Sequence, residues 1–119
     1  MSDQRHHTID YVEIPVTDLA ETKRFYTEAF GWRFNDYGPA YAGIRSADGS
    51  SEVGGLNPAG EVRVGGPLVL LYSEDLDRTV ADVERAGGRV LQGPYDFPGG
   101  RRFHFADPSG NELGVFADS

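Results

Sequence analysis

The chain has 119 residues, of which 39% are hydrophobic and 25% are charged, as is ordinary for a single globular domain. Its net charge of −8 repels phosphate backbones and argues against a nucleic-acid partner. No apolar stretch approaches the roughly 20 residues of a membrane span, and without cysteine the chain has no disulfide, thiol nucleophile or cysteine–metal site.

The first half of the chain predicts a strand, a helix and three short strands. Alternation over residues 7–16 has the period of two that a strand requires. One face carries Val12, Ile14 and Val16, and the other carries Ile9, Tyr11, Glu13 and Pro15. A helix is predicted to begin after an N-cap at Thr17 or Asp18 and to end at Gly31. Short strands are predicted at 32–34, 40–45 and 52–56.

The second half repeats this order after a turn-rich connection over residues 57–66. Asp75-Leu76 opens a second helix 57 positions after Asp18-Leu19, because 75 − 18 = 57, and that helix ends near Gly87. Strands are predicted at 67–72, 89–91, 102–105 and 112–116, with a long loop at 92–100. We therefore expect one domain over 1–119, with βαβββ modules at 7–57 and 67–118 and a pocket between them.

Two segments carry a family resemblance that covers nearly the whole chain. One is the run 9–19 followed by Phe25-Tyr26 and Phe30-Gly31-Trp32, and the other is Phe105-Ala106-Asp107-Pro108-Ser109-Gly110-Asn111-Glu112-Leu113. Both resemble the vicinal oxygen chelate superfamily, which includes glyoxalase I, fosfomycin-resistance thioltransferases, extradiol dioxygenases and bleomycin-resistance proteins. The resemblance implies an α+β fold in which two tandem βαβββ modules form a curved, partly closed mixed sheet with the helices outside. It also implies a homodimer, but it does not specify a reaction.

The enzymes of that superfamily hold a divalent metal at four strand positions. Carried over through the two motifs and the internal repeat, these positions are Tyr11, Gly54, Leu68 and Gly114. Glycine and leucine offer no side-chain ligand, and a neutral tyrosine is a poor one. A shift of one residue substitutes Pro67 or Gly55, which is no better. We therefore predict a pocket with no metal ion and no other cofactor, lined by Tyr11, Gly54, Leu68, Tyr72, Arg102 and Gly114.

Glu13 and His104 are the candidate acid–base residues. Glu13 shares the strand face of Tyr11, which looks into the cup of the resembled proteins, and a carboxylate in an apolar cup can act as an acid or base near neutral pH. His104 alternates with Phe103 and Phe105, so it is predicted to point away from the core. Either residue could instead serve the structure alone. Arg102 or Arg101 could bind a substrate carboxylate or simply lie on the surface, and Tyr72 is expected to pack with Leu68 and Leu70.

Two functions remain open on these grounds. One is a metal-independent protein that binds a small organic ligand, like the bleomycin-resistance proteins. The other is a lyase or isomerase of the glyoxalase type that uses Glu13 and His104. A metal enzyme with relocated ligands would need a third ligand that the sequence does not supply. The polar start of the chain and the absence of cysteine favour a cytoplasmic protein with no membrane partner.

Overall fold

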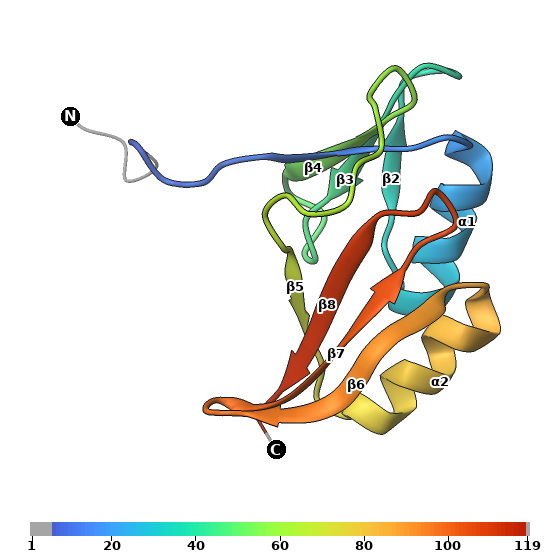
Figure 1. The fold of residues 1–119 in the computed structure, drawn as a ribbon. Helices are drawn as coiled ribbons and strands as arrows, with labels where there is room; N and C mark the ends of the chain where they lie inside the picture. Colours follow the sequence, from blue (N-terminus) through green and yellow to red (C-terminus); the bar gives the residue numbers. More distant parts are fainter. Residues whose placement is uncertain (1–5, 119) are drawn as a thin grey trace.

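The computed structural model describes residues 6–118 and consists of two helices and two mixed sheets (Figure 1). The first half contains β1 Val12–Pro15, α1 Leu19–Phe30, β2 Phe34–Asp36, β3 Ala42–Arg45 and β4 Glu52–Asn57. The second half contains β5 Leu70–Tyr72, α2 Leu76–Ala86, β6 Arg89–Phe97, β7 Gly100–Ala106 and β8 Glu112–Ala117. Each half thus has the order βαβββ, which confirms the predicted fold class. Neither helix of the described chain is long and apolar enough to cross a membrane.

The two sheets have matching strand orders. The first sheet runs β1-β4-β3-β2 and the second runs β5-β8-β7-β6. In each sheet the first pair, β1 with β4 or β5 with β8, is parallel, and the other pairs are antiparallel. Within residues 6–118 no strand pair joins the two sheets, so the sheets stay open toward each other rather than closing into a barrel.

The predicted loop at 92–100 is wrong. β6 continues to Phe97 and β7 begins at Gly100, so this segment is a long hairpin with a short turn. Its strand pairing shifts register between Val90 and Gln92 and again between Gln92 and Tyr95. Such bulges let a strand accommodate residues, here Gly93-Pro94, that would otherwise interrupt it.

Both helices are capped in the same way. The side chain of Asp18 accepts a hydrogen bond from the backbone N–H of Glu21 at 3.1 Å, and Asp75 accepts one from Arg78 at 3.2 Å. Gly31 and Gly87 end the helices with φ of 72° and 106°. These left-handed conformations favour glycine, which has no Cβ to oppose them. The aspartate and glycine positions identified in the sequence therefore fix both ends of both helices.

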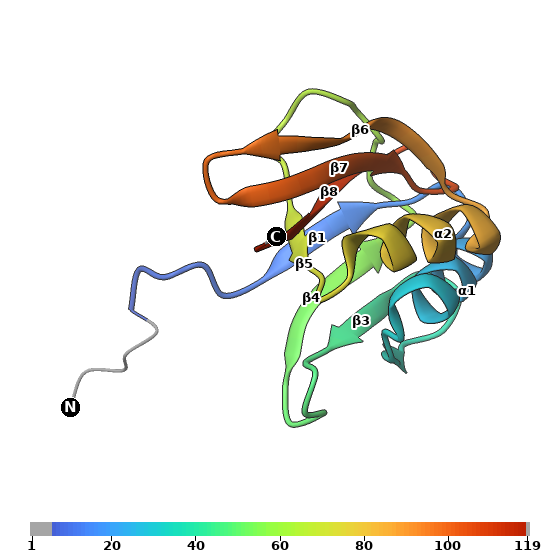
Figure 2. The same cartoon turned by 90° about the horizontal axis from the view of Figure 1, so that it is seen from below.

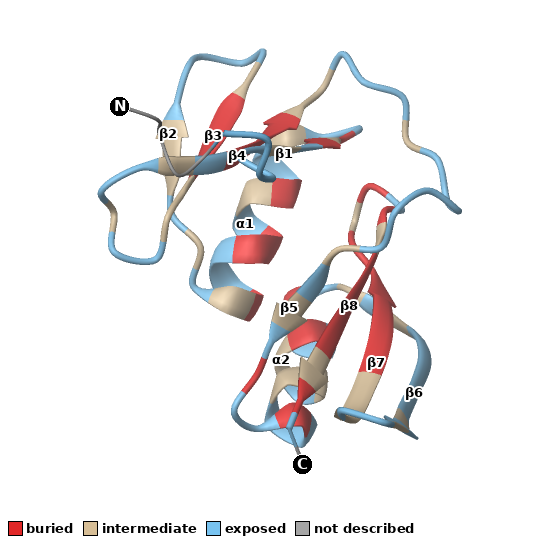
Figure 3. Cartoon of the chain, turned by 90° about the vertical axis from the view of Figure 1, so that its left-hand side faces the viewer, coloured by how far each residue is buried: buried red, intermediate tan, exposed pale blue. Residues whose placement is uncertain are grey.

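One hydrophobic core is shared by the two halves. The helices lie side by side (Figure 2) and the buried segments of both sheets face them (Figure 3). The ring of Phe105 on β7 lies 5.9 Å from that of Phe25 and 5.5 Å from that of Phe30, both on α1. Phe25 and Phe105 are fully buried. The second sheet therefore packs against the helix of the first half, and neither half has a separate core.

Hydrogen bonds from the turn between β7 and β8 join the two halves. The Oδ1 atom of buried Asp107 accepts hydrogen bonds from the backbone N–H groups of Ser109 and Asn111, at 2.9 and 3.0 Å. Its Oδ2 atom accepts from the Tyr26 hydroxyl of α1 at 2.9 Å and from the Asn111 amide at 3.1 Å. The same amide donates to the carbonyl oxygen of Pro15 at 2.7 Å. The segment that carries one of the two family motifs is thus an inter-half junction.

Candidate functional site

The outer face of the first sheet, which is opposite α1, carries Glu13. Ile14 and Val16 are buried against the helix, whereas Glu13 is exposed on the other side, as the alternation predicted. Its carboxylate accepts hydrogen bonds from the Tyr41 hydroxyl and the Asn57 amide, both at 3.0 Å. Glu13 is therefore held by Asn57 at the end of β4 and by Tyr41, the residue before β3.

A second carboxylate, Glu52, lies on the same face and joins this network. Its Oε1 atom accepts from the Tyr37 hydroxyl at 2.7 Å and from the Asn35 amide at 3.0 Å. Its Oε2 atom accepts from the Tyr11 hydroxyl at 2.9 Å, and Tyr11 lies 2.7 Å from the Tyr41 hydroxyl. We call these residues the tyrosine–carboxylate network: Tyr11, Glu13, Asn35, Tyr37, Tyr41, Glu52 and Asn57. Of these, the sequence had singled out only Tyr11 and Glu13.

Two glycines make room for this network. A Cβ atom on Gly55 would lie 1.9 Å from the Tyr41 hydroxyl oxygen, and one on Gly43 would lie 2.0 Å from a Glu52 carboxylate oxygen. Side chains at these two positions would therefore overlap the network. Both glycines are buried, so Tyr41 and Glu52 lie flat across the backbone of β3 and β4.

In the tyrosine–carboxylate network the pKa values of the three tyrosines are raised, so their hydroxyl groups keep their protons. The pKa of Tyr41 is raised, chiefly by partial burial, and the pKa of Tyr37 is raised, chiefly by its hydrogen bond to Glu52. The pKa of Tyr11 is raised by partial burial and by its hydrogen bonds to Tyr41 and Glu52. The pKa of Glu52 is lowered from its ordinary value of 4.5, because Asn35, Tyr37 and Tyr11 donate to it. The network thus combines neutral phenols with an ionised carboxylate.

Acidification is expected to open this network only below pH 4.5, the ordinary pKa of Glu52. A carboxyl group whose pKa is lowered by folding stabilises the fold above its unfolded pKa, and this contribution is lost as the pH falls through the folded pKa. Carbon-13 NMR of the Glu52 carboxyl group should give a midpoint below 4.5. Tyr37→Phe should move that midpoint upward, because one donor is removed. A midpoint at or above 4.5 in the unsubstituted protein would contradict the hydrogen bonds.

On the second sheet, His104 lies between two polar partners. It is 7% exposed, its Nδ1 atom lies 2.7 Å from a Glu112 carboxylate oxygen, and its Nε2 atom lies 2.8 Å from the Tyr95 hydroxyl. The Nε–H of Arg102 donates to that same hydroxyl at 2.5 Å. We call these four residues the histidine network. Neither hydrogen bond of His104 goes to Glu13, so the structure does not bring the two predicted acid–base residues together as a pair.

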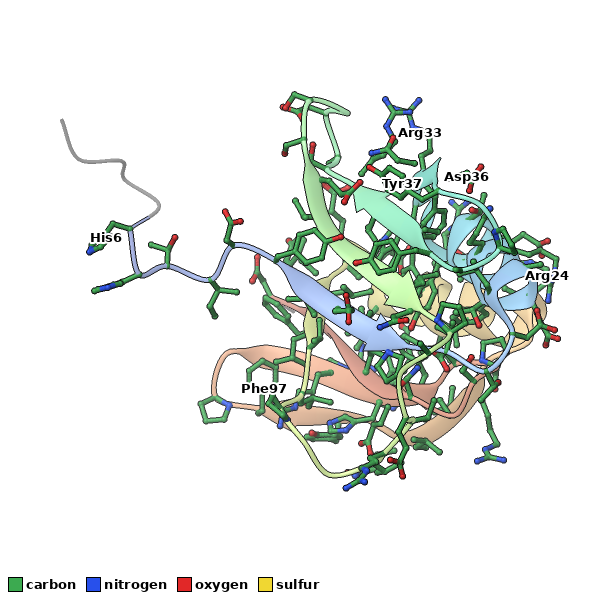
Figure 4. The ribbon with its side chains drawn as sticks, turned by 90° about the horizontal axis from the view of Figure 1, so that it is seen from above. His6, Arg24, Arg33, Asp36, Tyr37 and Phe97 are labelled. Atoms are coloured by element: carbon green, nitrogen blue, oxygen red, sulfur yellow. The ribbon has the colours of Figure 1, made fainter. Side chains whose placement is uncertain are left out.

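The remaining predicted lining residues on this sheet are arranged around aromatic rings. The Arg102 guanidinium lies 5.5 Å from the Tyr95 ring centre and 5.2 Å from that of Phe97. The hydroxyl of Tyr72 donates to Asp118 at 3.2 Å, and its ring packs edge-on against Phe116. Figure 4 shows Phe97 and Tyr37 on opposite halves of the molecule. The second sheet therefore presents aromatic rings around Arg102, whereas the first presents carboxylates and phenols.

The four positions implied for a metal do not fit one. Gly114 is covered by Leu70 and Leu68, whose methyl groups lie 2.5 and 3.7 Å from the place of a Cβ. Gly54 pairs with Val12 and Ile44 on the helix side of the first sheet, whereas Gly55 shares the face of Glu13. Gly55 rather than Gly54 is therefore the counterpart of Gly114, because the strand register differs from the alignment of the two short motifs. No group of three His, Cys, Asp or Glu side chains within residues 6–118 is placed to hold a metal ion.

Along β1, two of the cavities in the described part of the chain lie where the halves meet. The first has a volume of about 400 Å³ and lies between β1, the connection over residues 61–69 and the start of β8. Its walls include Glu13, Pro15, Leu68, Glu112 and Leu113. The second has a volume of about 550 Å³ and lies between the end of α1, β3 and β5 on the helix side of the first sheet. Only the first contains residues that the sequence predicted for the pocket, namely Glu13 and Leu68.

Comparisons with known proteins agree on one family. The sequence model of the Glyoxalase/Bleomycin resistance protein/Dioxygenase superfamily matches residues 8–115. CFP32 of Mycobacterium tuberculosis, which carries glyoxylase as a provisional name, is 28% identical over 124 residues, spanning 97% of this chain and 47% of that protein. The chain thus spans about half the length of the first curated relatives it matches. A glyoxylase-like domain-containing protein of Didymella fabae is 29% identical over 89% of this chain and 90% of its own length.

Solved structures share the fold. TnmS3, an antibiotic binding protein from Streptomyces, superposes with a TM-score of 0.69 at 25% identity, over 100% of this chain and 98% of its own. A glyoxalase-related enzyme from Fulvimarina pelagi superposes with a TM-score of 0.78 at 19% identity, over 93% and 88% of the two chains. The second likeness concerns the fold alone.

Proposed function

Because the chain belongs to the Glyoxalase/Bleomycin resistance protein/Dioxygenase superfamily, we propose that it binds a small organic molecule between its halves without a metal ion. The observation that carries this proposal is the cavity of about 400 Å³, whose walls come from β1, the inter-half connection and β8. This volume lies within the range of ligand sites in proteins. The antibiotic-binding neighbour supports the same class of function.

The walls of the cavity specify what kind of molecule fits. Most are apolar, and the charged groups are Glu13, Glu61, Arg63 and Glu112. Arg63 forms an ion pair with Glu61 at 2.9 Å, which leaves the carboxylates of Glu13 and Glu112, and that of Glu112 also contacts His104. Glu13 is already oriented by Tyr41 and Asn57. A mainly apolar molecule with a basic or hydrogen-bond-donating group therefore suits the cavity best.

A pair of leucine substitutions tests this proposal. Leu68→Trp should fill the cavity and weaken binding of an aromatic amine, found by thermal-shift screening and measured by calorimetry, by about tenfold or more. Leu91→Trp is the matched control, because Leu91 is similarly exposed, at 40% against 36%, but does not line the cavity. Equal effects of the two substitutions would refute the site. A full equivalent of metal that survives dialysis of the purified protein would refute the metal-free proposal.

A homodimer belongs to the same proposal. The outer face of the second sheet exposes Leu68, Leu70 and Tyr72, each at 36% or more. A second copy of this chain that packed there would cover these apolar side chains.

The second candidate function is acid–base catalysis by a lyase or isomerase of the glyoxalase type. The observation that favours it is His104, which is buried and has both ring nitrogens within hydrogen-bonding distance of a partner. Glu112 and Tyr95, and not Glu13, are the residues that contact His104. The candidate therefore involves the histidine network rather than the pair Glu13 and His104.

A further inference from the structure

The six tyrosines of the chain differ in what their hydroxyl groups contact. Five donate to a carboxylate: Tyr11 and Tyr37 to Glu52, Tyr26 to Asp107, Tyr41 to Glu13 and Tyr72 to Asp118. Tyr95 instead contacts the Nε2 atom of His104 and the Nε–H group of Arg102. A carboxylate keeps the proton on a phenol, whereas a neutral imidazole nitrogen can accept it.

The hydrogen bonds of the histidine network fix where its protons lie. Arginine can only donate, so the Tyr95 oxygen accepts from Arg102 and its own hydrogen points to His104. A carboxylate accepts hydrogen bonds, so the contact with Glu112 favours the His104 tautomer with hydrogen on Nδ1 and a free electron pair on Nε2. Transfer of the phenol proton to Nε2 then needs no movement of heavy atoms. It yields a phenolate beside Arg102 and an imidazolium beside Glu112.

The guanidinium of Arg102 has N–H groups that Tyr95 does not use. Its Nε–H group is used by Tyr95, and no ion pair within 4.0 Å joins its guanidinium to a carboxylate in residues 6–118. Arg102 is half-buried, and its guanidinium carbon lies 5.5 Å from the ring centre of Tyr95 and 5.2 Å from that of Phe97. These two rings restrict the orientation of the guanidinium. A guanidinium held in this way and left without an acidic partner in a chain of net charge −8 is suited to a carboxylate ligand.

A bulge and an aromatic surface complete the arrangement. The register shift between Gln92 and Tyr95 brings Tyr95 opposite Arg102 in the strand ladder, and bulges commonly redirect a side chain in this way. Phe97 and Phe116, whose ring centres lie 6.4 Å apart, extend the apolar surface beside Arg102. An aryl group could therefore pack against these rings while its carboxylate meets Arg102.

We propose that Tyr95 is an acid–base residue, that His104 and Glu112 store and position its proton, and that Arg102 binds the carboxylate of an aryl 2-oxo acid. The inference rests on the second candidate function, and of its four residues only Glu112 also lines the cavity beside β1. The Tyr95 phenolate removes a proton from the carbon next to the ketone, and the electron pair of that C–H bond moves to the ketone oxygen, giving an enolate. Return of a proton from Tyr95 restores the ketone, so neither an oxidant nor a cofactor is consumed.

Phenylpyruvate is the probe that tests this proposal. Proton NMR in heavy water should show faster loss of its C3 hydrogens with the protein than with buffer. Tyr95→Phe should slow this exchange by roughly 100-fold or more while leaving phenylpyruvate bound. Arg102→Lys should weaken binding by about tenfold, because a lysine cannot form two parallel hydrogen bonds to a carboxylate. Tyr37→Phe is the matched control, since that hydroxyl lies on the other sheet and donates to Glu52.

The outcomes separate the parts of the proposal. Nitrogen-15 NMR should show His104 with hydrogen on Nδ1, and Glu112→Gln should redistribute that hydrogen between the ring nitrogens if Glu112 positions the ring. Exchange that is no faster than in buffer, or that is unchanged in Tyr95→Phe, overturns the role of Tyr95. Failure of phenylpyruvate to bind overturns the substrate class. Neither result bears on the cavity beside β1, which the Leu68→Trp substitution tests by itself.

Discussion

Asp107→Ala is expected to lower the free energy of unfolding by about 3 kcal/mol or more, because it removes a buried acceptor from several donors at once. Asp107 is 5% exposed and accepts from Tyr26, from the Asn111 amide and from two backbone N–H groups of its turn. Alanine would remove the acceptor of the Tyr26 hydroxyl and of both backbone N–H groups, and the Asn111 amide would keep only its bond to Pro15. Urea denaturation followed by circular dichroism measures the loss.

Two further substitutions provide free energies of unfolding with which the effect of Asp107→Ala can be compared. Tyr26→Phe removes one of the donors to Asp107 and should cost about 1–3 kcal/mol. Asp36→Ala removes an exposed carboxylate that forms an ion pair with Lys23, and it should cost no more than about 1 kcal/mol. If Asp107→Ala were no more destabilising than Asp36→Ala, the hydrogen bonds of Asp107 would not stabilise the junction between the halves.

Phe105→Ala is expected to destabilise the protein by about 3–5 kcal/mol, the usual range for truncating a buried phenylalanine. The larger consequence concerns cooperativity. Phe105 belongs to the second sheet but packs against Phe25 and Phe30 of α1, so its removal weakens both halves together. Thermal unfolding followed by fluorescence and by circular dichroism should therefore shift to lower temperature as one transition.

Phe97→Ala is the matched control for this experiment. Phe97 is also on the second sheet, but it is half-buried on the outer face beside Arg102 and Phe116. Its truncation should cost less than about 1.5 kcal/mol, because it leaves no enclosed cavity. If Phe105→Ala split unfolding into two separate transitions, the halves would be independent folding units and the shared core would not couple them.

The architecture could be predicted because its signals are local. Asp18 and Gly31 lie next to the helix they cap, and the alternation around Glu13 spans only a few residues. The hairpin of β6 and β7 was missed because Gly93-Pro94 is a turn signal in sequence, whereas a bulge absorbs it in the sheet. Local composition does not distinguish a loop from a bulged strand.

The site was predictable only in part, because its contacts join distant residues. Tyr11 and Glu52 are 41 positions apart, and no periodicity connects them. His104 and Glu112 are eight positions apart, but they become neighbours only through the β7–β8 pairing. A short motif predicts Gly54 in place of Gly55 because sequence alone does not contain the strand register, and a slip of one residue changes the face on which a side chain lies.

The glycine at position 55 has a consequence for how this chain could change. Gly55 is the residue whose face and register match a metal-ligand position, and the space that a ligand side chain would need holds the hydroxyl of Tyr41. At Gly114 the corresponding space holds a methyl group of Leu70. No single substitution at either position could therefore introduce a ligand without displacing a neighbour. A side chain introduced at Gly55 or at Gly114 would therefore change the position of Tyr41 or of Leu70 as well, so each glycine is coupled to the neighbour that fills its space.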